Sequence, residues 1–361
     1  MLVSTLGRYL GFTVFKAMLS VFGTFFFLIL TLDFVELMRR AGDSPTATTG
    51  LIVQLAFYRV PAVAEQIFPF AVLFGGMFAL LNLSRKLELV IARSVGVSAW
   101  QFLRPAVFAA GMIGLFSVGI YNPLSAELKQ RASALEASLF ARSGKVASGK
   151  EVWIRQRGTD GQSIMRAAAA LDNGQRLSQV AFFTFDLAGA FRERAEAREA
   201  ILQDGYWELR DARIFSALEE PQSYATYLLA TNLEVEQVRQ SFTPAESVSF
   251  WALPEVIERT EKAGIDSTRY RLQRQLLMAR PLLLIAMVLV AASVSLRFFR
   301  FGGVAKMVIG GVSAGFVLYV ITQLSGDLGS AGIVNPVAAA WLPAVTGSLL
   351  GGLALLYQED G

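Results

Sequence analysis

Six long apolar runs constrain this chain more than any other feature, because each is long enough to cross a lipid bilayer. A membrane-spanning helix needs about 20 mainly apolar residues to cross a hydrocarbon core about 30 Å thick. The composition agrees, since 54% of the 361 residues are hydrophobic and only 17% are charged. The sequence therefore predicts an α-helical membrane protein with six spans, at about residues 12–37, 61–83, 105–126, 276–296, 307–326 and 328–357.

The distribution of Lys and Arg predicts how these spans are oriented. Cytoplasmic segments of membrane proteins carry an excess of both residue types. Here the positive charges gather before span one, between spans two and three, and between spans four and five. Both ends of the chain are therefore expected in the cytoplasm. Arg39 and Arg40, which follow span one, break the pattern because they fall on the opposite side.

The long segment between spans three and four has a different composition. Residues 127–270 are polar and contain short alternating runs, among them VWIRQR, SQVAFFTFD, YWELRDARIF and YATYLLA. Such alternation is typical of β-strands, and DNG at 172–174 and DG at 204–205 are turn signals. We predict an all-β, jellyroll-like domain of about eight strands, inserted between helical regions 1–126 and 271–361. The alternative is that RERAEAREA forms a helix, since Ala, Glu and Arg favour helices.

The residue types exclude several classes of function. The chain contains no Cys and no His, which removes disulfides, thiolate nucleophiles and imidazole ligands or bases. Its net charge of +4 is too small to indicate binding to nucleic acid. GKVASGKE at 144–151 matches the start of a phosphate-binding loop, but Glu151 stands where that loop needs Ser or Thr. We predict no catalytic residue, no metal site and no cofactor site in this chain.

A charged amphipathic segment lies between spans two and three, at about residues 83–95. Wound as a helix, it gathers aliphatic side chains on one face: Leu83, Leu87, Val90 and Ile91. The outward face and its flank carry the residues that we predict to bind a separate ATPase: Arg85, Glu88, Ala92 and Arg93. Gly96 is a stop signal, and Ser98 with Gln101 forms a capping-box pattern that opens span three. The alternative is a solvated loop whose basic residues only set the topology.

Four stretches of the chain resemble the lipopolysaccharide export permeases of the LptF/LptG family. They are RYLGFTVFKAML…LDFVELMRRAG, FPFAVLFGGMFALLNLSRKLELVIARSVGVSAWQFLRP, DGYWELRDARIF and VNPVAAAWLPAV. They occur in the same order and cover nearly the whole chain, with the same plan of six spans and a large insert. DFVELMRRAG after span one is more similar to the LptG branch than to the LptF branch.

The resemblance implies a specific assembly. These permeases pair as an LptF–LptG heterodimer in the bacterial inner membrane, each with a periplasmic β-jellyroll. A cytoplasmic LptB-type ATPase dimer binds ATP and docks on their coupling helices, where Glu88 occupies the place of the family's carboxylate. The complex extracts lipopolysaccharide and passes it to LptC- and LptA-type jellyroll proteins on the way to the outer membrane.

The resemblance also gives a role to the end of span one. Arg39 and Arg40 match a basic pair at the mouth of the family's lipid cavity, and guanidinium groups bind phosphate well. Asp33 stands where family members carry a basic residue, so a phosphate contact does not transfer to it. Intramembrane carboxylates usually line cavities or pair with other charges. The predicted lipopolysaccharide-binding set is Asp33, Glu36, Arg39, Arg40, Arg131, Arg271 and Arg274. The alternative for the arginines is interfacial anchoring by snorkelling.

Small residues in spans five and six predict close contacts between helices. GVSAG at 311–315 and GSLLG at 347–351 both place glycines four residues apart, a spacing that lets helix backbones approach. We expect Gly311 and Gly315 to form a movable contact with the partner subunit. The alternative is the ordinary glycine content of membrane helices.

Two other classes of function remain open from the residues. A different ATP-driven extrusion or lipoprotein-release permease would also need a docking helix, but it typically has four spans. A membrane-anchored enzyme acting on envelope lipids would need a catalytic set built from Asp, Glu, Ser, Lys or Tyr.

Overall fold

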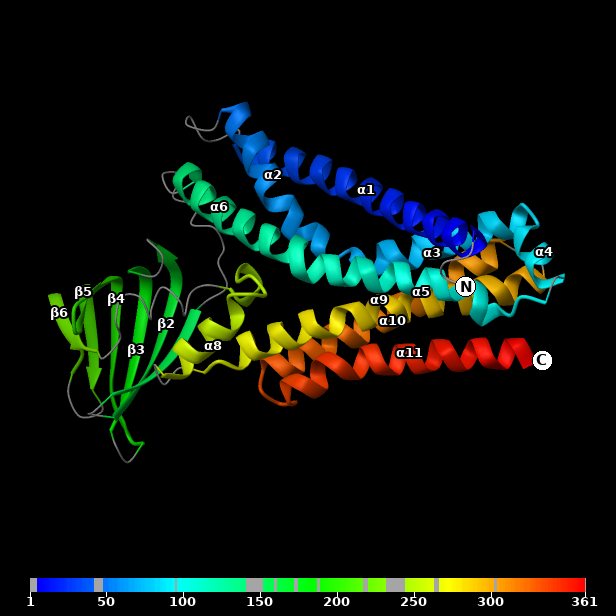
Figure 1. The fold of residues 1–361 in the computed structure, drawn as a ribbon. Coiled ribbons are helices and arrows are strands. Elements are labelled where there is room, and N and C mark those ends of the chain that lie inside the picture. Colours follow the sequence, from blue (N-terminus) through cyan, green and yellow to red (C-terminus); the bar gives the residue numbers. More distant parts are fainter. Residues whose placement is uncertain are drawn as a thin grey trace.

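The computed structural model describes most of the chain as a long helical bundle with a β-sheet at one end (Figure 1). The described residues are 5–41, 48–94, 96–140, 152–158, 161–171, 175–186, 189–216, 220–231, 244–262, 266–301 and 304–360.

Among these residues, six helical paths are long and apolar enough to cross a membrane, as predicted. Five of them are single helices: α1 (Thr5–Ala41), α3 (Phe68–Arg85), α9 (Thr268–Phe301), α10 (Val304–Ser330) and α11 (Pro336–Asp360). The sixth runs without interruption through α5 (Ala99–Phe116), the π-helix η1 (Ser117–Tyr121) and α6 (Asn122–Phe140).

The second span begins later than predicted. The hydropathy pattern places its start at Pro61, but Pro61 lies inside a separate helix, α2 (Thr49–Glu65). Two residues that are not helical separate α2 from α3, and α3 then begins with Pro69 in its first turn, where the missing N–H has no helical partner to lose. Apolar side chains of α2 pack with those of α1 and α6.

The third span is longer than predicted. Its helix continues through α6 to Phe140, so residues 127–140 extend the bundle and do not begin the β domain. The strands occupy the interval 152–230, and a 3₁₀ turn (η4, Ala245–Ser247) and α8 (Leu253–Lys262) then lead back into α9.

Close contacts between helices fix the centre of the bundle. A Cβ added at Gly75 of α3 would collide with the backbone of Met18 in α1, and one added at Gly114 of α5 would collide with Pro281 in α9. In α3 and α9, 61% of the apolar stretch is buried, against 6% in α1 and 17% in α10. The helices α3 and α9 therefore form the core, while α1 and α10 keep most of their surface free.

The two ends of the bundle differ in what they carry. The sheet lies at one end, beside the last turns of α6 and the start of α9 (Figure 1). The first turns of α1 and the last turns of α11 lie at the other end, together with α4 (Glu88–Ser94).

The described strands form one antiparallel sheet in the order of the sequence. They are β1 (Val152–Gly158), β2 (Gly161–Leu171), β3 (Arg176–Phe185), β4 (Phe191–Gln203), β5 (Tyr206–Ser216) and β6 (Gln222–Ala230). Phe182 and Trp207 are the largest fully buried side chains of the sheet. A jellyroll has two sheets, so this finer description of the domain stays a prediction.

The stretch RERAEAREA is a strand, as predicted, because its alternation outweighs the helix preference of its residues. Ala195 and Ala197 are buried two residues apart in β4, which is the period of a strand. Ala195 pairs with Phe182 on one side and with Ile214 on the other. Gly205, in the predicted turn before β5, has a φ of +83°. The turn at 172–174 and the motif at 144–151 lie outside the described residues.

Candidate functional site

The segment between α3 and α5 folds as a short helix bounded by two breaks. Leu87 has a φ of +61°, a left-handed conformation that separates α3 from α4. At the other end Gly96 has a φ of +83°, and Ser98 and Gln101 form the complete capping box that starts α5. The predicted stop and restart are confirmed, but the predicted helix 83–95 is divided at Leu87.

The break at Leu87 changes which side chains face outward. Leu87 and Ile91, predicted to be buried, are 58% and 61% exposed, whereas Ala92, predicted to face outward, is 8% exposed. The predicted faces are wrong for these three residues because a helix that restarts at Glu88 does not keep the phase of α3. Exposed apolar side chains on a short helix suit contact with another protein. The side chain of Arg93 lies outside the described set, and Arg85 is exposed.

Glu88 stands at the start of α4 and faces α1. Its Oε1 accepts a hydrogen bond from the Tyr9 hydroxyl at 3.2 Å, and this contact is exposed. Among the described residues this is the one hydrogen bond to the carboxylate, which keeps further acceptor capacity for a partner.

A charged cluster joins α1, α2 and α6 toward the sheet end of the bundle. Arg59 of α2 lies 3.4 Å from the Asp33 carboxylate and 3.5 Å from the Glu136 carboxylate. Both distances exceed those of ordinary hydrogen bonds. The Oδ2 atom of Asp33 is buried and has no hydrogen-bond partner among the described residues. This cluster is therefore only partly paired.

The predicted basic pair follows one turn later on α1. Glu36 accepts hydrogen bonds from Arg39 at 2.9 Å and from Arg40 at 2.8 Å. The two arginine side chains are 76% and 51% exposed. One carboxylate shared by two guanidinium groups leaves a net positive charge, and exposed pairs of this kind are weak. The arginines can therefore exchange Glu36 for another anion.

The other predicted arginines lie on different helices. Arg131 of α6 pairs with Glu127, and Arg271 of α9 lies 2.6 Å from Glu261 of α8. Hydrogen bonds from Ser267 and from Arg271 hold the pKa of Glu261 below its ordinary value. Among the described residues, no ion pair links Arg131, Arg271 or Arg274 to the charges at the end of α1.

A buried charged network escapes the sequence analysis. Glu65, the last residue of α2, accepts hydrogen bonds from Arg280 of α9, from Asn122 at 2.9 Å and from Ser125 at 2.5 Å. Arg280 also donates to the Ser117 hydroxyl at 3.2 Å. The side chains of Glu65 and Arg280 are 9% and 17% exposed. A charge in each of two apolar stretches is the signal that could have revealed this pair.

The network reaches the segment that returns from the sheet. Asn122 accepts a hydrogen bond from the backbone N–H of Phe250 at 2.8 Å. The next residue, Trp251, donates through its indole N–H to the Gly119 carbonyl at 3.1 Å, inside the π-helix. The polar cluster thus ties α2 and two spans, the third and the fourth, to the connection between the sheet and the membrane domain.

Gly311 and Gly315 of α10 allow close packing against another helix of the same chain. A Cβ added at Gly311 would collide with Met77, and one added at Gly315 would collide with Leu73, both side chains of α3. Close helix packing at these glycines is as predicted, but the neighbour is α3. The expectation that they face a partner subunit is wrong for this structure, because α3 already covers them.

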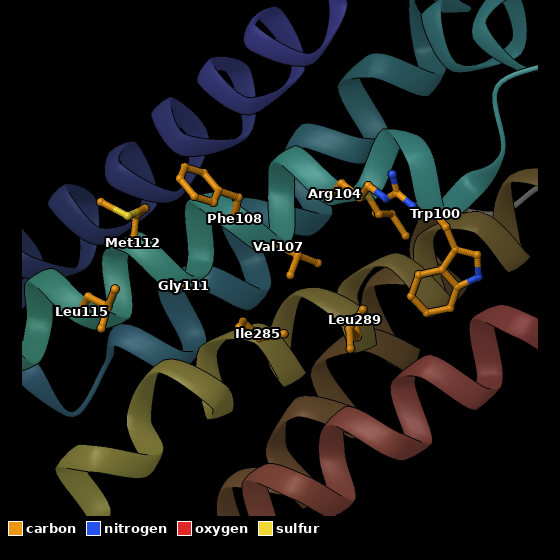
Figure 2. Close-up of a pocket in the computed structure, with 10 residues that line it drawn as sticks. Trp100, Arg104, Val107, Phe108, Gly111, Met112, Leu115, Ile285 and Leu289 are labelled. Atoms are coloured by element: carbon orange, nitrogen blue, oxygen red, sulfur yellow. The ribbon is translucent and has the colours of Figure 1, made fainter. Parts of the chain in front are cut away.

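An apolar groove of about 520 Å³ lies between α5 and α9. Figure 2 shows Trp100 and Arg104 at one end of it and Leu115 at the other, with Ile285 and Leu289 contributed by α9. Arg104 is the one charged side chain among the described residues that line it.

Comparison with known proteins assigns the chain to a family. A family model described as lipopolysaccharide export system permease LptF/LptG matches residues 8–358. The chain belongs to the LptF/LptG family. The lipopolysaccharide export system permease protein LptG of Haemophilus influenzae is 24% identical over 99% of this chain and 97% of its own length. LptG of Escherichia coli K12 is 22% identical over 98% of both chains.

Membership of the LptF/LptG family confirms the resemblance read from the sequence. The chain is a multi-pass inner-membrane protein of a permease family, and hence a transporter subunit rather than an enzyme. The partly paired cluster at Arg59 and the basic pair at Arg39 and Arg40 are its candidate lipid-binding site, and α4 is its candidate docking site.

Proposed function

We propose that this chain is a membrane subunit that extracts lipopolysaccharide from the inner membrane for transport to the outer membrane. Lipopolysaccharide carries phosphates at the bilayer surface, so its capture needs cations at that depth beside an accessible apolar face. The end of α1 provides both. The single observation that carries the proposal is the exposed basic pair, whose one ion-pair partner among the described residues is the shared Glu36.

The free surfaces of the bundle support a second membrane subunit. The helices α1 and α10 bury the smallest shares of their apolar stretches. We place an LptF-type partner against these two helices, so that lipopolysaccharide enters between the subunits. The sheet domain, taken as a periplasmic jellyroll, then passes the lipid to LptC- and LptA-type proteins.

A separate LptB-type ATPase is proposed to dock on α4. The support is the exposure of Leu87 and Ile91 beside Glu88, at the end of the bundle opposite the sheet. In this arrangement both ends of the chain and α4 are cytoplasmic, and the sheet domain is periplasmic. ATP is bound and hydrolysed by the partner, and this chain needs no cofactor.

Docking is tested by replacing Glu88 and, separately, its partner inside the chain. Glu88→Lys is expected to reduce copurification of the ATPase, because removing a charge bonded across an interface commonly costs about 2–5 kcal/mol. Tyr9→Phe is the matched control, since it removes the internal hydrogen bond and leaves the carboxylate. Normal ATPase binding and export with Glu88→Lys would reject the docking site. An equal defect in Tyr9→Phe would assign Glu88 to internal packing.

A second test concerns the origin of ATP hydrolysis. The purified chain alone is expected to show no ATPase activity. ATP hydrolysis should be measured only after the partner ATPase is added. Hydrolysis by the chain alone that is lost in Lys150→Ala would contradict the proposed division of labour.

A further inference from the structure

The groove between α5 and α9 has the form of a binding site for a single lipid chain. Its lining is apolar apart from Arg104, and its volume is about 520 Å³. Trp100 and Arg104 stand one turn apart on α5, at the same end of the groove (Figure 2). An aromatic side chain beside a cation is the arrangement that membrane proteins use at the level of lipid headgroups.

The length of the groove matches one leaflet of a bilayer. Leu115 lies eleven positions after Arg104, which is about 16.5 Å along a helix. Half of a hydrocarbon core of about 30 Å is about 15 Å. A lipid whose phosphate contacts Arg104 would therefore have the end of its acyl chain near Leu115.

Arg104 is available for such a contact. Its side chain is exposed, and no ion pair or hydrogen bond joins it to another described residue. It precedes Pro105, where the apolar run of the span begins, so the guanidinium group lies at the boundary of the hydrocarbon core. A cation at this depth favours a lipid phosphate, which it can bind with charge-assisted hydrogen bonds.

We propose that the groove binds one anionic phospholipid from the leaflet on the α4 side of the membrane. One acyl chain lies between α5 and α9, and the phosphate contacts Arg104 beside Trp100. This site is separate from the basic pair of α1, which lies at the sheet end of the bundle. The third and fourth spans already touch at Gly114 and Pro281, so a bound phospholipid would cover the surface groove beside this contact.

The groove offers a variant that blocks it without removing a contact. A Cβ at Gly111 would meet only the Ile285 side chain at 3.7 Å, an ordinary contact distance, so Gly111→Phe can place its ring in the groove. Gly23→Phe adds the same ring to an exposed position of α1 where nothing lies within 4 Å of the new Cβ. Arg104→Gln removes the cation, and Arg8→Gln removes an exposed cation outside the groove.

The test is native mass spectrometry of the full chain in nanodiscs made from equal parts of phosphatidylglycerol and phosphatidylethanolamine. The wild type, Gly23→Phe and Arg8→Gln should each retain one phosphatidylglycerol. Gly111→Phe should retain none, and Arg104→Gln should lose its preference for phosphatidylglycerol by about tenfold or more.

Three results would overturn the proposal. The first is absence of retained phospholipid in the wild type, and the second is equal retention in Gly111→Phe. The third is a photo-crosslink from position 112 to a protein rather than to lipid in the assembled complex, which would show that a partner helix covers the groove. These results do not depend on lipopolysaccharide export, so a failure here leaves the proposed function standing.

Discussion

Two charged clusters include residues of the same helix, α2, and they differ in how completely their charges are paired. Arg59 lies 3.4 and 3.5 Å from its two carboxylates, and one oxygen of Asp33 has no hydrogen-bond partner among the described residues. Glu65, six residues later, accepts bonds from three side chains and is almost fully buried. The first cluster can accept a ligand, and the second is complete without one.

The difference separates a binding site from a structural joint. In a low-dielectric interior a charged group that loses its partner is strongly destabilising, so the Glu65 network resists change. In a partly exposed cluster with long contacts, the ion pairs contribute little free energy, so a new anion can replace them at small cost. We therefore propose that the region of Arg59, Arg39 and Arg40 captures lipid, and that the region of Glu65 and Arg280 connects the helices mechanically.

The largest effect is expected from breaking the buried pair. Glu65→Ala leaves Arg280 without its carboxylate, and the free energy of unfolding should fall by about 3–5 kcal/mol. Thermal unfolding of the purified chain in detergent measures the change. The double variant Glu65→Leu/Arg280→Leu should lose less, because it removes both charges together. If Glu65→Ala unfolds at the same temperature as the wild type, the network does not stabilise the packing of the helices.

A smaller effect on stability is expected at Arg59, with a larger effect on function. Arg59→Ala removes two long contacts, and the free energy of unfolding should fall by about 1–2 kcal/mol. Lipopolysaccharide recovered with the purified complex should fall by tenfold or more if the cluster binds its phosphates. Arg259→Ala, on α8, is the control, since this arginine also pairs with a carboxylate. Equal lipid recovery in both variants would contradict the assignment.

The sequence predicts the parts of this fold that depend on local patterns. Whether an apolar run can span a bilayer depends on its own length and composition, so the number of spans could be predicted. The capping box at Ser98 and the strand at Ala195 also follow from neighbouring residues. The end of α2 at Glu65 and the break at Leu87 do not, because they depend on helices that meet in space.

The candidate site shows the same division. Glu36, Arg39 and Arg40 lie within one turn and a half, so their pairing follows from helical spacing. Glu65 and Arg280 are 215 positions apart, and no local pattern connects them. Charges in apolar runs can be noticed in the sequence, but their partners become visible only when the helices are packed.

The smallest effect on stability is expected from Glu36. Glu36→Gln weakens two exposed ion pairs, and the free energy of unfolding should change by less than about 1 kcal/mol. Lipopolysaccharide binding should stay the same or increase, because Arg39 and Arg40 lose their competing carboxylate. Glu255→Gln, which weakens an exposed pair on α8, is the matched control for stability. A marked loss of lipid binding in Glu36→Gln alone would mean that Glu36 positions the arginines.

Photo-crosslinking in living cells tests most directly whether lipopolysaccharide reaches the basic end of α1. A photoreactive residue is placed at position 39, 40 or 259, and the crosslinked chain is probed for lipopolysaccharide. We expect crosslinks from positions 39 and 40 and none from 259. Export should fall in the double variant Arg39→Ala/Arg40→Ala, because each guanidinium–phosphate bond contributes about 1.5–3 kcal/mol. Absence of a crosslink at both positions, with normal export by a correctly inserted double variant, would contradict the lipid-binding role and leave the arginines as interfacial anchors.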